Sequence, residues 1–394
     1  MTSTREGDAG VAVCFVAHSA YGALAGGSSG HIGGIERQQA LTAKWLSQRG
    51  WRVSMITWDE GQPQGDVVDG VRVIRMCRAD AGIKGLRFFY PKWTSLIRAM
   101  RQADADVYYQ NCGEYVTGQV ALWCRRYGRK FVYSVASDPD CDRRLPEMHT
   151  LRERVLYRYG LSRADRVIVQ TRRQQALLRE GFGLDSEVLP MPCPGPSNGE
   201  YKPLSSSNHK SARVLWVGRL CEAKNPCRFL DVAEACPDLS FDFVGPVCDT
   251  PYSQSVCARA RRLPNVTVHG PVAREKVPEF YKRAACLCCT SNFEGFPNTF
   301  LEAWSHGLPV VSTFDPDDLI ASHGLGAVTG DTEGLVHAVR SLLASPERWG
   351  RASANARQYY LENHTVDGAM ERFKRVFLEA LGQAPASVNA GCPG

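Results

Sequence analysis

The feature that most constrains the fold is an alternation of short, β-rich apolar runs with segments of helical periodicity along the 394-residue chain. This alternation is typical of α/β proteins, in which helices cover both faces of a parallel sheet. In the first half, the predicted strands are Val11–Ala17, Arg52–Trp58, Val71–Met76, Val107–Gln110, Lys130–Val135 and Arg166–Gln170. The clearest helical patterns between them are Gly34–Arg49, Glu114–Tyr127 and Arg172–Glu180.

A polar segment, Met191–Lys210, interrupts this alternation and is rich in Pro, Ser, Gly and Asn, which is typical of an interdomain linker. The alternation then restarts. The predicted strands are Val214–Val217, Leu239–Val244, Val266–His269, Ala285–Thr290 and Pro309–Ser312. The predicted helices are Lys224–Ala235, Ser253–Arg262, Arg274–Arg283, Asn298–Ser305, Thr332–Leu343 and a segment from Pro346 to about Leu381.

A chain of this length is expected to form two domains of roughly 200 residues each. We place the first domain at residues 1–192, the linker at 193–210 and the second domain at 211–350. Helical residues 351–381 follow the second domain, and residues 382–394 read as a loose tail.

Composition narrows the class of protein. The first ten residues are polar and the longest apolar runs are strand-sized, so the sequence predicts neither a secretory signal nor a membrane-spanning helix. The net charge of +6 fits an anionic small molecule or a membrane surface, and it argues only weakly for nucleic acid. The 15 cysteines form no disulfide framework, and the crowded Cys286, Cys288 and Cys289 are interpreted as small buried hydrophobes in a reduced cytoplasm.

Two loops have the composition of anion-binding loops. Gly26–Gly34 follows the first strand and opens a helix, where glycines allow a close backbone approach and the helix presents free N–H groups. Val217–Lys224 follows the first strand of the second half, where open α/β sheets bind ligands. There Gly218 turns the chain out of the strand, and Arg219 and Lys224 can together neutralise a diphosphate without a metal. Taken alone, each loop also fits a flexible turn or solvated surface cations.

A third feature, Ser291–Thr313, reads SNFEGFPNTFLEAWSHGLPVVST. A strand ends near Thr290, a loop follows, and a short helix is predicted to begin with Asn298 or Thr299 as its N-cap. The N–H groups of Gly295 and Phe296 and the helix N-terminus are expected to point toward one ligand.

Two glutamates lie in this segment, eight residues apart. Glu294 is in the loop before the helix, and Glu302 is on its second turn. A carboxylate accepts hydrogen bonds from paired hydroxyls, so we expect Glu302 to hold a ribose diol and Glu294 to contact the hydroxyls of a sugar.

Several of these segments resemble retaining glycosyltransferases of the GT-B fold, family 4 in particular. FEGFPNTFLEAWSHGLPVVS resembles the E-x7-E signature, and VGRLCEAKN resembles the Gly-Arg-x4-Lys element. GGIERQQALTAKWLSQRGWRVSMIT and ADRVIVQT resemble first-domain segments. The resemblance extends over about residues 11–380, and it is more specific in the second half than in the first.

The resemblance implies a fold class of α/β with two Rossmann-like domains facing across a cleft, and C-terminal helices that cross back to the first domain. It implies a retaining, metal-independent hexosyltransferase that uses a nucleotide-sugar as co-substrate, with no other cofactor. Arg219 and Lys224 would bind the donor diphosphate and stabilise the leaving group. Gly33 and Gly34 would approach the donor phosphate or the acceptor from the other domain.

The chain departs from the family at one position. Many members carry a histidine after the fourth or fifth strand of the first domain, where this chain reads SVASDPDCD. Asp138 is our candidate for the polar group at that place, as a proton acceptor or a hydrogen-bond partner of the acceptor hydroxyl.

Two other functions remain as alternatives. Asp138 and Asp140 also resemble the DxD metal motif of the second glycosyltransferase fold, which would make the enzyme metal-dependent. The chain would otherwise be a non-catalytic, sugar-nucleotide-binding partner protein, or an epimerase or phosphorylase of the same architecture.

The stretch Gly82–Trp93, GIKGLRFFYPKW, interleaves cations with aromatic residues, which suits a patch on anionic lipid as well as an ordinary helix with a basic face. The family resemblance adds a glycan or lipid-linked acceptor. We therefore expect a cytoplasmic protein that binds peripherally at the inner face of the cell membrane, and no nucleic-acid partner.

Overall fold

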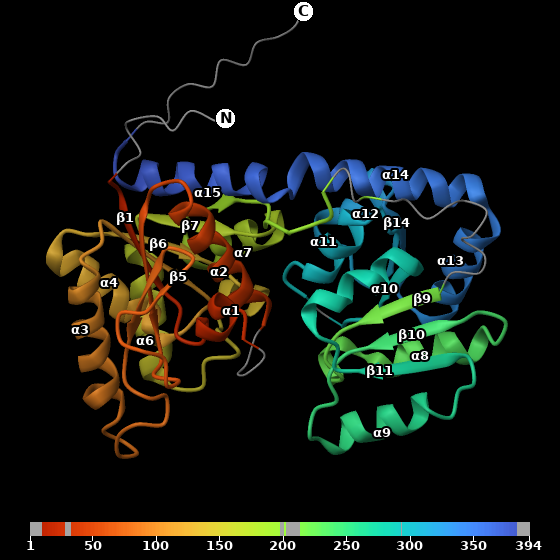
Figure 1. Ribbon diagram of the computed structural model, residues 1–394, viewed down its shortest axis with the longest axis horizontal. Helices are drawn as coiled ribbons and strands as arrows, with labels where there is room; N and C mark the ends of the chain where they lie inside the picture. Colours follow the sequence, from red (N-terminus) through yellow and green to blue (C-terminus); the bar gives the residue numbers. More distant parts are fainter. Residues whose placement is uncertain (1–9, 28–32, 198–200, 202–212, 293, 384–394) are drawn as a thin grey trace, which may run out of the picture. The chain divides into compact units, whose positions relative to one another are not determined.

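The computed structural model of the protein describes residues 10–27, 33–197, 201, 213–292 and 294–383, which fall into two compact units (Figure 1). Unit 1 comprises Met1–Leu189 and Met370–Gly394, and unit 2 comprises Pro190–Ala369. No helix in the described ranges combines the length and the apolar character needed to cross a bilayer.

Unit 1 is built on a sheet whose described strands lie in the order β3-β4-β2-β1-β5-β6-β7-β8. All neighbours pair in parallel except β3 and β4. The strands are β1 (Ala12–Val16), β2 (Arg52–Thr57), β3 (Val67–Val68), β4 (Val71–Arg75), β5 (Val107–Asn111), β6 (Lys130–Ser134), β7 (Arg166–Val169) and β8 (Glu187–Val188). The helices are α1 (Tyr21–Ala25), α2 (Gly34–Ser47), α3 (Thr94–Ala103), α4 (Tyr115–Tyr127), α5 (Asp138–Cys141), α6 (Leu151–Arg163), α7 (Arg172–Phe182) and the π-helical turn η1 (Phe88–Trp93).

Unit 2 repeats this plan with the described strands in the order β11-β10-β9-β12-β13-β14, all parallel. The strands are β9 (Arg213–Val217), β10 (Phe241–Val244), β11 (Val266–Gly270), β12 (Ala284–Cys289), β13 (Val310–Ser312) and β14 (Gly326–Val328). The helices are α8 (Pro226–Ala235), α9 (Pro251–Ala260), α10 (Val277–Arg283), α11 (Asn298–Ser305), α12 (Leu319–His323), α13 (Thr332–Ala344) and α14 (Pro346–Asn363), with short 3-10 turns at η3 (Glu222–Lys224), η4 (Arg274–Lys276) and η5 (Pro316–Asp318).

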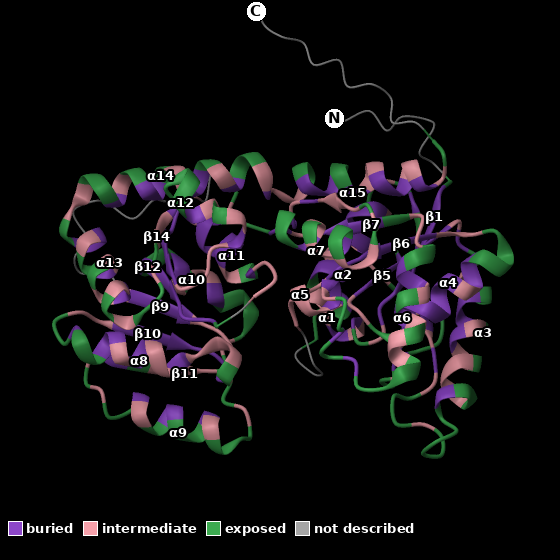
Figure 2. Cartoon of the chain, turned by 180° about the vertical axis from the view of Figure 1, so that it is seen from behind, coloured by how far each residue is buried: buried purple, intermediate pink, exposed green. Residues whose placement is uncertain are grey.

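In both units the central strands are buried runs between helices that expose only their outer faces (Figure 2). Strand β12 carries Cys286, Cys288 and Cys289, all buried, as predicted for apolar packing. Because strand order reverses direction between β1 and β5, and again between β9 and β12, each sheet has one switch point at its carboxyl edge. Ligands of open α/β sheets bind at such points.

The last helix, α15 (Val366–Ala380), packs on unit 1 from Met370 onward. Its Phe377 ring lies 5.7 Å from Tyr109, 6.2 Å from Trp51 and 6.5 Å from Phe15. The predicted return of the chain to the first unit is therefore confirmed for α15, whereas α14 lies within unit 2.

One predicted helix is wrong: the segment from Pro346 to Leu381 is two helices, broken after Asn363. His364 occupies the break, where its ring Nδ1 lies 2.9 Å from the Met191 carbonyl and its own carbonyl accepts the Cys193 N–H at 2.9 Å. The break depends on this contact between residues far apart in sequence, and neither Pro nor Gly marks it. Of the predicted linker, residues 193–197 and 201 are described, and the others lie outside the described residues.

Helices α4 and α6 approach closely through two glycines. A Cβ on Gly118 would lie 2.2 Å from the Leu156 carbonyl oxygen, and a Cβ on Gly160 would lie 2.5 Å from the Thr117 carbonyl. These are backbone atoms, so neither helix can accommodate a methyl group without moving away from the other.

We predict that Gly160→Ala lowers the free energy of unfolding by about 1–3 kcal/mol, because the helices must separate. The matched control is Gly350→Ala in α14, where a Cβ meets nothing within 4 Å. It should be neutral or stabilising by up to about 1 kcal/mol, because alanine favours a helix over glycine. Urea unfolding of the full chain measures both, and equal effects would contradict the packing argument.

Candidate active site

The candidate site lies at the switch point of unit 2, where β9 and β12 are adjacent strands (Figure 1). The loop after β9 carries Lys224, and the loop after β12 carries Glu294. Because both strands are parallel, both loops leave the same edge of the sheet, and two side chains 70 residues apart in sequence meet there.

Lys224 forms an ion pair with Glu294. The same carboxylate oxygen accepts the Ser291 hydroxyl at 2.7 Å. The side chains of Lys224 and Glu294 are 29% and 14% exposed, so the pair is largely but not fully withdrawn from water. A small cavity beside the pair is lined by Lys224, Ser291, Glu294 and Thr299, among others.

Buried hydrogen bonds fix the two loops to each other. The indole N–H of Trp216 donates to the Thr290 hydroxyl at 3.1 Å, and this hydroxyl donates to the Lys224 carbonyl at 3.0 Å. Asn292 donates its backbone N–H to the Ala223 carbonyl at 2.9 Å. Strand β12 therefore holds the backbone of the loop that carries Lys224.

Glycines allow a close backbone approach where β9 ends. Gly218 donates its N–H to the Val244 carbonyl at 3.1 Å, and a Cβ on Gly245 would lie 1.7 Å from the Gly218 carbonyl oxygen. Gly245 has φ +157°, which also favours glycine. The next residue, Arg219, is exposed, and no hydrogen bond or ion pair joins its side chain to another described residue.

Helix α11 begins at Asn298, as predicted, but the expected cap is wrong. The N-cap residue is Pro297, at φ −68° and ψ 116°, and no side chain caps the helix. The pyrrolidine ring fixes an entry angle that suits the start of a helix, so the chain needs no Asn or Thr cap to begin here. The positive end of α11 therefore lacks a side-chain acceptor next to the Lys224–Glu294 pair.

Glu302 is buried on α11 and has two protein partners. It forms an ion pair with Arg274 and accepts the Tyr281 hydroxyl at 2.7 Å. Burial, with the charge of Glu302, raises the pKa of Tyr281 well above its ordinary value, so this phenol stays protonated and donates. A carboxylate has about four lone-pair sites, so these contacts orient Glu302 and still leave acceptor capacity for a ligand.

The remaining predicted donor residues lie in or next to this loop. Gly295 and Phe296 are half-buried, Asn298 is exposed, and Thr299 lines the small cavity. The Phe296 ring packs 5.6 Å from His364 and 6.3 Å from Trp304, so its side chain anchors the loop to the body of unit 2.

The glycine loop of unit 1 is described only in part, since residues 28–32 lie outside the described ranges. Gly33 precedes α2 and donates its N–H to the Glu36 carboxylate at 2.9 Å, and Gly34 is the first residue of the helix. The Gly33 N–H therefore already has an acceptor within the helix.

Asp138 and Asp140 have different partners at the carboxyl end of β6. Asp138 accepts Arg173 Nε at 2.9 Å and Gln174 Nε2 at 3.2 Å. Asp140 is 4% exposed and accepts the N–H groups of Ala136 and Ser137, each at 3.3 Å. One carboxylate is thus paired with a guanidinium and the other with backbone amides, which does not fit a shared divalent cation. Across the described residues, no group of three or more His, Cys, Asp and Glu is arranged to hold a metal ion.

Several site residues were missed from the sequence. Ser291, Thr290 and Trp216 connect the two loops, and Arg274 and Tyr281 orient Glu302. Thr290 and Ser291 could have been found, because polar residues directly after a buried strand fall on the ligand-binding edge. Arg274 and Tyr281 could not, since their contact with Glu302 depends on how α10 packs on α11.

The two halves of the chain match two family models. Residues 33–194 match the model described as glycosyl transferase 4-like domain, and residues 211–345 match the model described as glycosyl transferases group 1. Among curated relatives, the D-inositol 3-phosphate glycosyltransferase of Rhodococcus erythropolis is 23% identical over 89% of this chain and 88% of the relative. The mannosylfructose-phosphate synthase of Agrobacterium fabrum is 26% identical over 69% of each.

Solved structures share the fold. The sucrose-phosphate synthase of Thermosynechococcus elongatus superposes with a TM-score of 0.73 at 17% identity, covering 95% of this chain and 99% of that one. HepE of Anabaena, solved in complex with UDP-glucose, has a TM-score of 0.70 at 16% identity, covering 93% and 99%. WaaG, a glycosyltransferase involved in lipopolysaccharide biosynthesis, has a TM-score of 0.64 at 17% identity, covering 92% and 99%.

The two doubly wound units and their structural neighbours define the class of the protein as a glycosyltransferase of the GT-B fold. Within that class, the two matched models place the chain in the glycosyl transferases group 1, as its sequence motifs predict.

We predict that Asp140 makes stability fall as pH rises from about 4 to about 6. Burial raises the pKa of Asp140 from 3.8 to about 6 despite its bonds to backbone N–H groups. Between these values the folded chain holds a proton that the unfolded chain has lost, so raising the pH favours unfolding. Asp140→Asn should remove this component, worth up to about 3 kcal/mol, and its free energy of unfolding relative to the parent should rise over that range. Urea unfolding from pH 4.5 to 7 tests this, and a constant difference between the two proteins would contradict it.

Proposed function

We propose that the protein transfers a hexosyl group from a nucleoside-diphosphate sugar to a hydroxyl acceptor, with retention of configuration and without a metal ion. The observation that carries the proposal is the Lys224–Glu294 pair at the switch point of unit 2. A cation there is placed for a diphosphate, and a carboxylate beside it is placed for the hydroxyls of the attached sugar.

The reaction needs stabilisation of the departing nucleoside diphosphate. The bond between the anomeric carbon and the diphosphate oxygen breaks, the acceptor oxygen bonds to that carbon on the same face, and the hydroxyl proton leaves with the diphosphate. Lys224 and Arg219 would hold the negative charge that develops on the leaving oxygen, together with the uncapped start of α11. The exposed Arg219 has no ion pair with a described residue to give up for this role.

Glu294 and Glu302 would position the donor. Glu294 would accept hydroxyls of the sugar while Lys224 turns toward the diphosphate, and Ser291 would keep the carboxylate in place. Glu302, oriented by Arg274 and Tyr281, would accept the ribose hydroxyls. HepE, a structural neighbour, was solved with UDP-glucose, which supports a nucleotide-sugar donor.

Asp138 is proposed to orient the acceptor hydroxyl. Both of its carboxylate oxygens already accept a hydrogen bond, from Arg173 and Gln174. This pairing favours a fixed hydrogen-bond acceptor over a base that takes a proton, because the guanidinium stabilises the charged form.

We predict that Lys224→Ala and Glu294→Gln each lower turnover by about 10²–10³-fold, the usual loss when one group that stabilises the transition state is removed. The matched control is Lys282→Ala, which removes an exposed lysine of unit 2 that pairs with Glu279. It should leave turnover near that of the parent. Release of nucleoside diphosphate from UDP-, GDP- and dTDP-sugars, with and without acceptors, measures these rates and identifies the donor.

Three results would contradict the proposal. Near-normal turnover of both site variants, with folding verified by circular dichroism, would remove the site assignment. Loss of turnover in EDTA with recovery in Mn²⁺ would remove metal independence. An inverted anomeric proton coupling in the product by NMR would remove retention. A protein that binds donor but never releases nucleoside diphosphate would instead be the non-catalytic partner.

The acceptor is proposed to be a glycan precursor or lipid-linked saccharide reached at an anionic membrane surface. Four apolar side chains between Gly82 and Trp93 are strongly exposed, at 74% for Ile83, 64% for Leu86, 56% for Phe89 and 73% for Tyr90. Lys84 and Arg87 are exposed among them. Apolar side chains among cations match the boundary between lipid tails and anionic headgroups.

A second segment extends this surface. The Arg152 guanidinium of α6 lies 4.0 Å from the ring centre of the buried Phe88, which brings the start of α6 beside η1. Leu151 and Val155 of α6 are 78% and 56% exposed and one helical turn apart. We name these residues, with Ile83, Leu86, Phe89 and Tyr90, the apolar-basic patch.

We predict that the parent protein floats with vesicles containing phosphatidylglycerol, and that Ile83→Ser, Leu86→Ser and Phe89→Ser combined weaken this binding at least roughly tenfold, because each buried side chain contributes about 1.5–3 kcal/mol. Val67→Ser is the matched control, since Val67 is 60% exposed on β3 outside the patch. Binding should weaken with added salt and be lower for pure phosphatidylcholine. Equal flotation of the triple variant and the parent would exclude this surface.

A further inference from the structure

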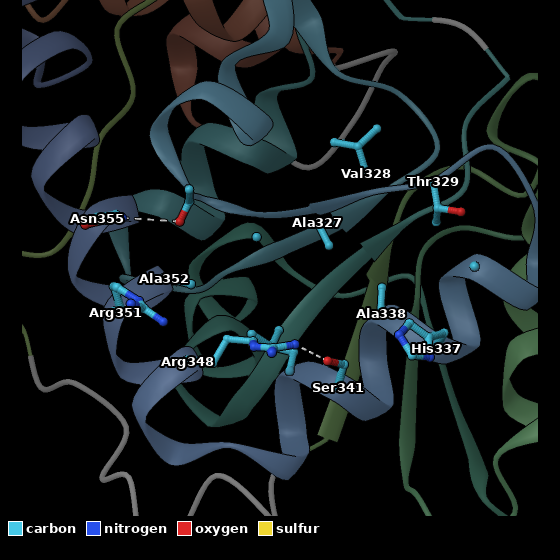
Figure 3. A pocket seen from close by; sticks show the side chains of 14 residues that line it. Ala327, Val328, Thr329, His337, Ala338, Ser341, Arg348, Arg351, Ala352 and Asn355 are labelled. Carbon is cyan, nitrogen blue, oxygen red and sulfur yellow. Dashed lines mark hydrogen bonds between the residues drawn. The ribbon is translucent and has the colours of Figure 1, made fainter.

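A second cavity of unit 2 lies away from the Lys224–Glu294 pair, between the edge strand β14 and helices α13 and α14 (Figure 3). Its volume is about 510 Å³, within the range of roughly 300–1,000 Å³ usual for small-molecule sites. No residue of the proposed donor site lines it.

The cavity exists because three elements present small side chains to it. Gly326 and Ala327 line it from β14, Gly334 and Ala338 from α13, and Ala352 from α14. The residues of each helix are spaced three or four positions apart, so they fall on one helical face. The helices therefore enclose a space that larger side chains would have filled.

The polar groups of the cavity are predominantly cationic. Arg348 and Arg351 of α14 and His337 of α13 surround the space, and Arg348 reaches across it to donate to the Ser341 hydroxyl (Figure 3). All three side chains are on exposed residues, so they form the mouth above the small apolar floor. None of the described lining residues is an Asp or a Glu.

The geometry of β14 adds backbone donors at the same place. In its parallel pairing with β13, the Thr329 N–H donates to the Ser312 carbonyl at 3.0 Å and the Leu325 carbonyl accepts the Val310 N–H at 3.0 Å. Because bonding residues alternate along a strand, Gly326 and Val328 direct their backbone groups away from β13. This open edge faces the side from which a ligand would enter.

We propose that this cavity binds a small phosphorylated molecule of about the size of a sugar phosphate. Two guanidinium groups on consecutive turns of one helix can hold a phosphate through bidentate hydrogen bonds, and no lining carboxylate competes for them. The apolar floor and the hydroxyls of Thr329 and Ser341 accommodate the organic part of the molecule. The inference is independent of the proposed transfer reaction.

Thermal-shift and calorimetric titrations test the proposal, with inorganic phosphate and glucose 6-phosphate as probes at constant ionic strength. Both probes should raise the Tm of the parent protein, glucose 6-phosphate at the lower concentration. Arg348→Gln with Arg351→Gln should raise the Kd of glucose 6-phosphate at least roughly tenfold, because two charge-assisted contacts are lost.

Two controls separate this cavity from other anion sites. Arg261→Gln with Arg262→Gln removes the same charge from exposed positions after α9, and its Kd should equal that of the parent. Lys224→Ala disables the proposed donor site and should also leave the Kd unchanged. Urea unfolding without a probe verifies that the double arginine variant is folded.

The results have distinct meanings. A Kd that rises only in the Arg348/Arg351 variant establishes the site, even if the protein transfers no sugar. An equal rise in the Arg261/Arg262 variant, a rise in Lys224→Ala alone, or no binding by the parent protein up to millimolar concentrations overturns the proposal.

Discussion

The arrangement of unit 2 depends on the hydrogen bonds that tie the end of β12 to the loop after β9. Thr290 both receives the Trp216 indole N–H and donates to the Lys224 carbonyl, so one hydroxyl joins a buried aromatic side chain to the backbone of a charged loop. A lysine side chain is flexible, and fixing its backbone is what limits where its ammonium group can reach. The ion pair with Glu294 is consequently a product of the strand order.

The two units place different chemistry at equivalent positions. At the switch point of unit 2, charged side chains are half-exposed and glycines bring two backbone turns together. At the carboxyl edge of unit 1, the acidic group Asp140 is buried and consumed by backbone amides, while Asp138 is paired with a neighbouring helix. The same topology thus supplies a charged site in one half and a rigid loop framework in the other.

Much of the fold could be predicted from the sequence, because buried parallel strands such as Val11–Ala17 and Ala285–Thr290 are continuous apolar runs between glycine and polar residues. Short edge strands such as β14, with Gly326 at φ +150°, carry too few apolar residues to produce that signal. The break between α14 and α15 was missed because a distant carbonyl, that of Met191, stabilises it.

The site could be predicted to the level of its loops but not of its contacts. Glu294, Lys224 and Glu302 stand out because charged residues at fixed spacing follow predicted strands. That Glu302 is held by Tyr281 and Arg274, and that Pro297 rather than Asn298 precedes α11, depends on how helices pack and on how a proline ring sets the backbone. A pattern in the sequence alone does not contain that information.

Helix α14 connects otherwise separate parts of unit 2. Its buried Arg357 donates to the Ser305 carbonyl at the end of α11, and at 3.4 Å to the Pro196 carbonyl, while Tyr360 donates to the Cys193 carbonyl at 2.9 Å. Arg348 and Arg351 lie two to three turns earlier on the same rod. A rigid helix cannot shift at one end alone, so a side chain that displaced its first turns would also displace the support of the glutamate-bearing helix. The tolerance of α14 to sequence change is therefore narrower than its exposed outer face suggests.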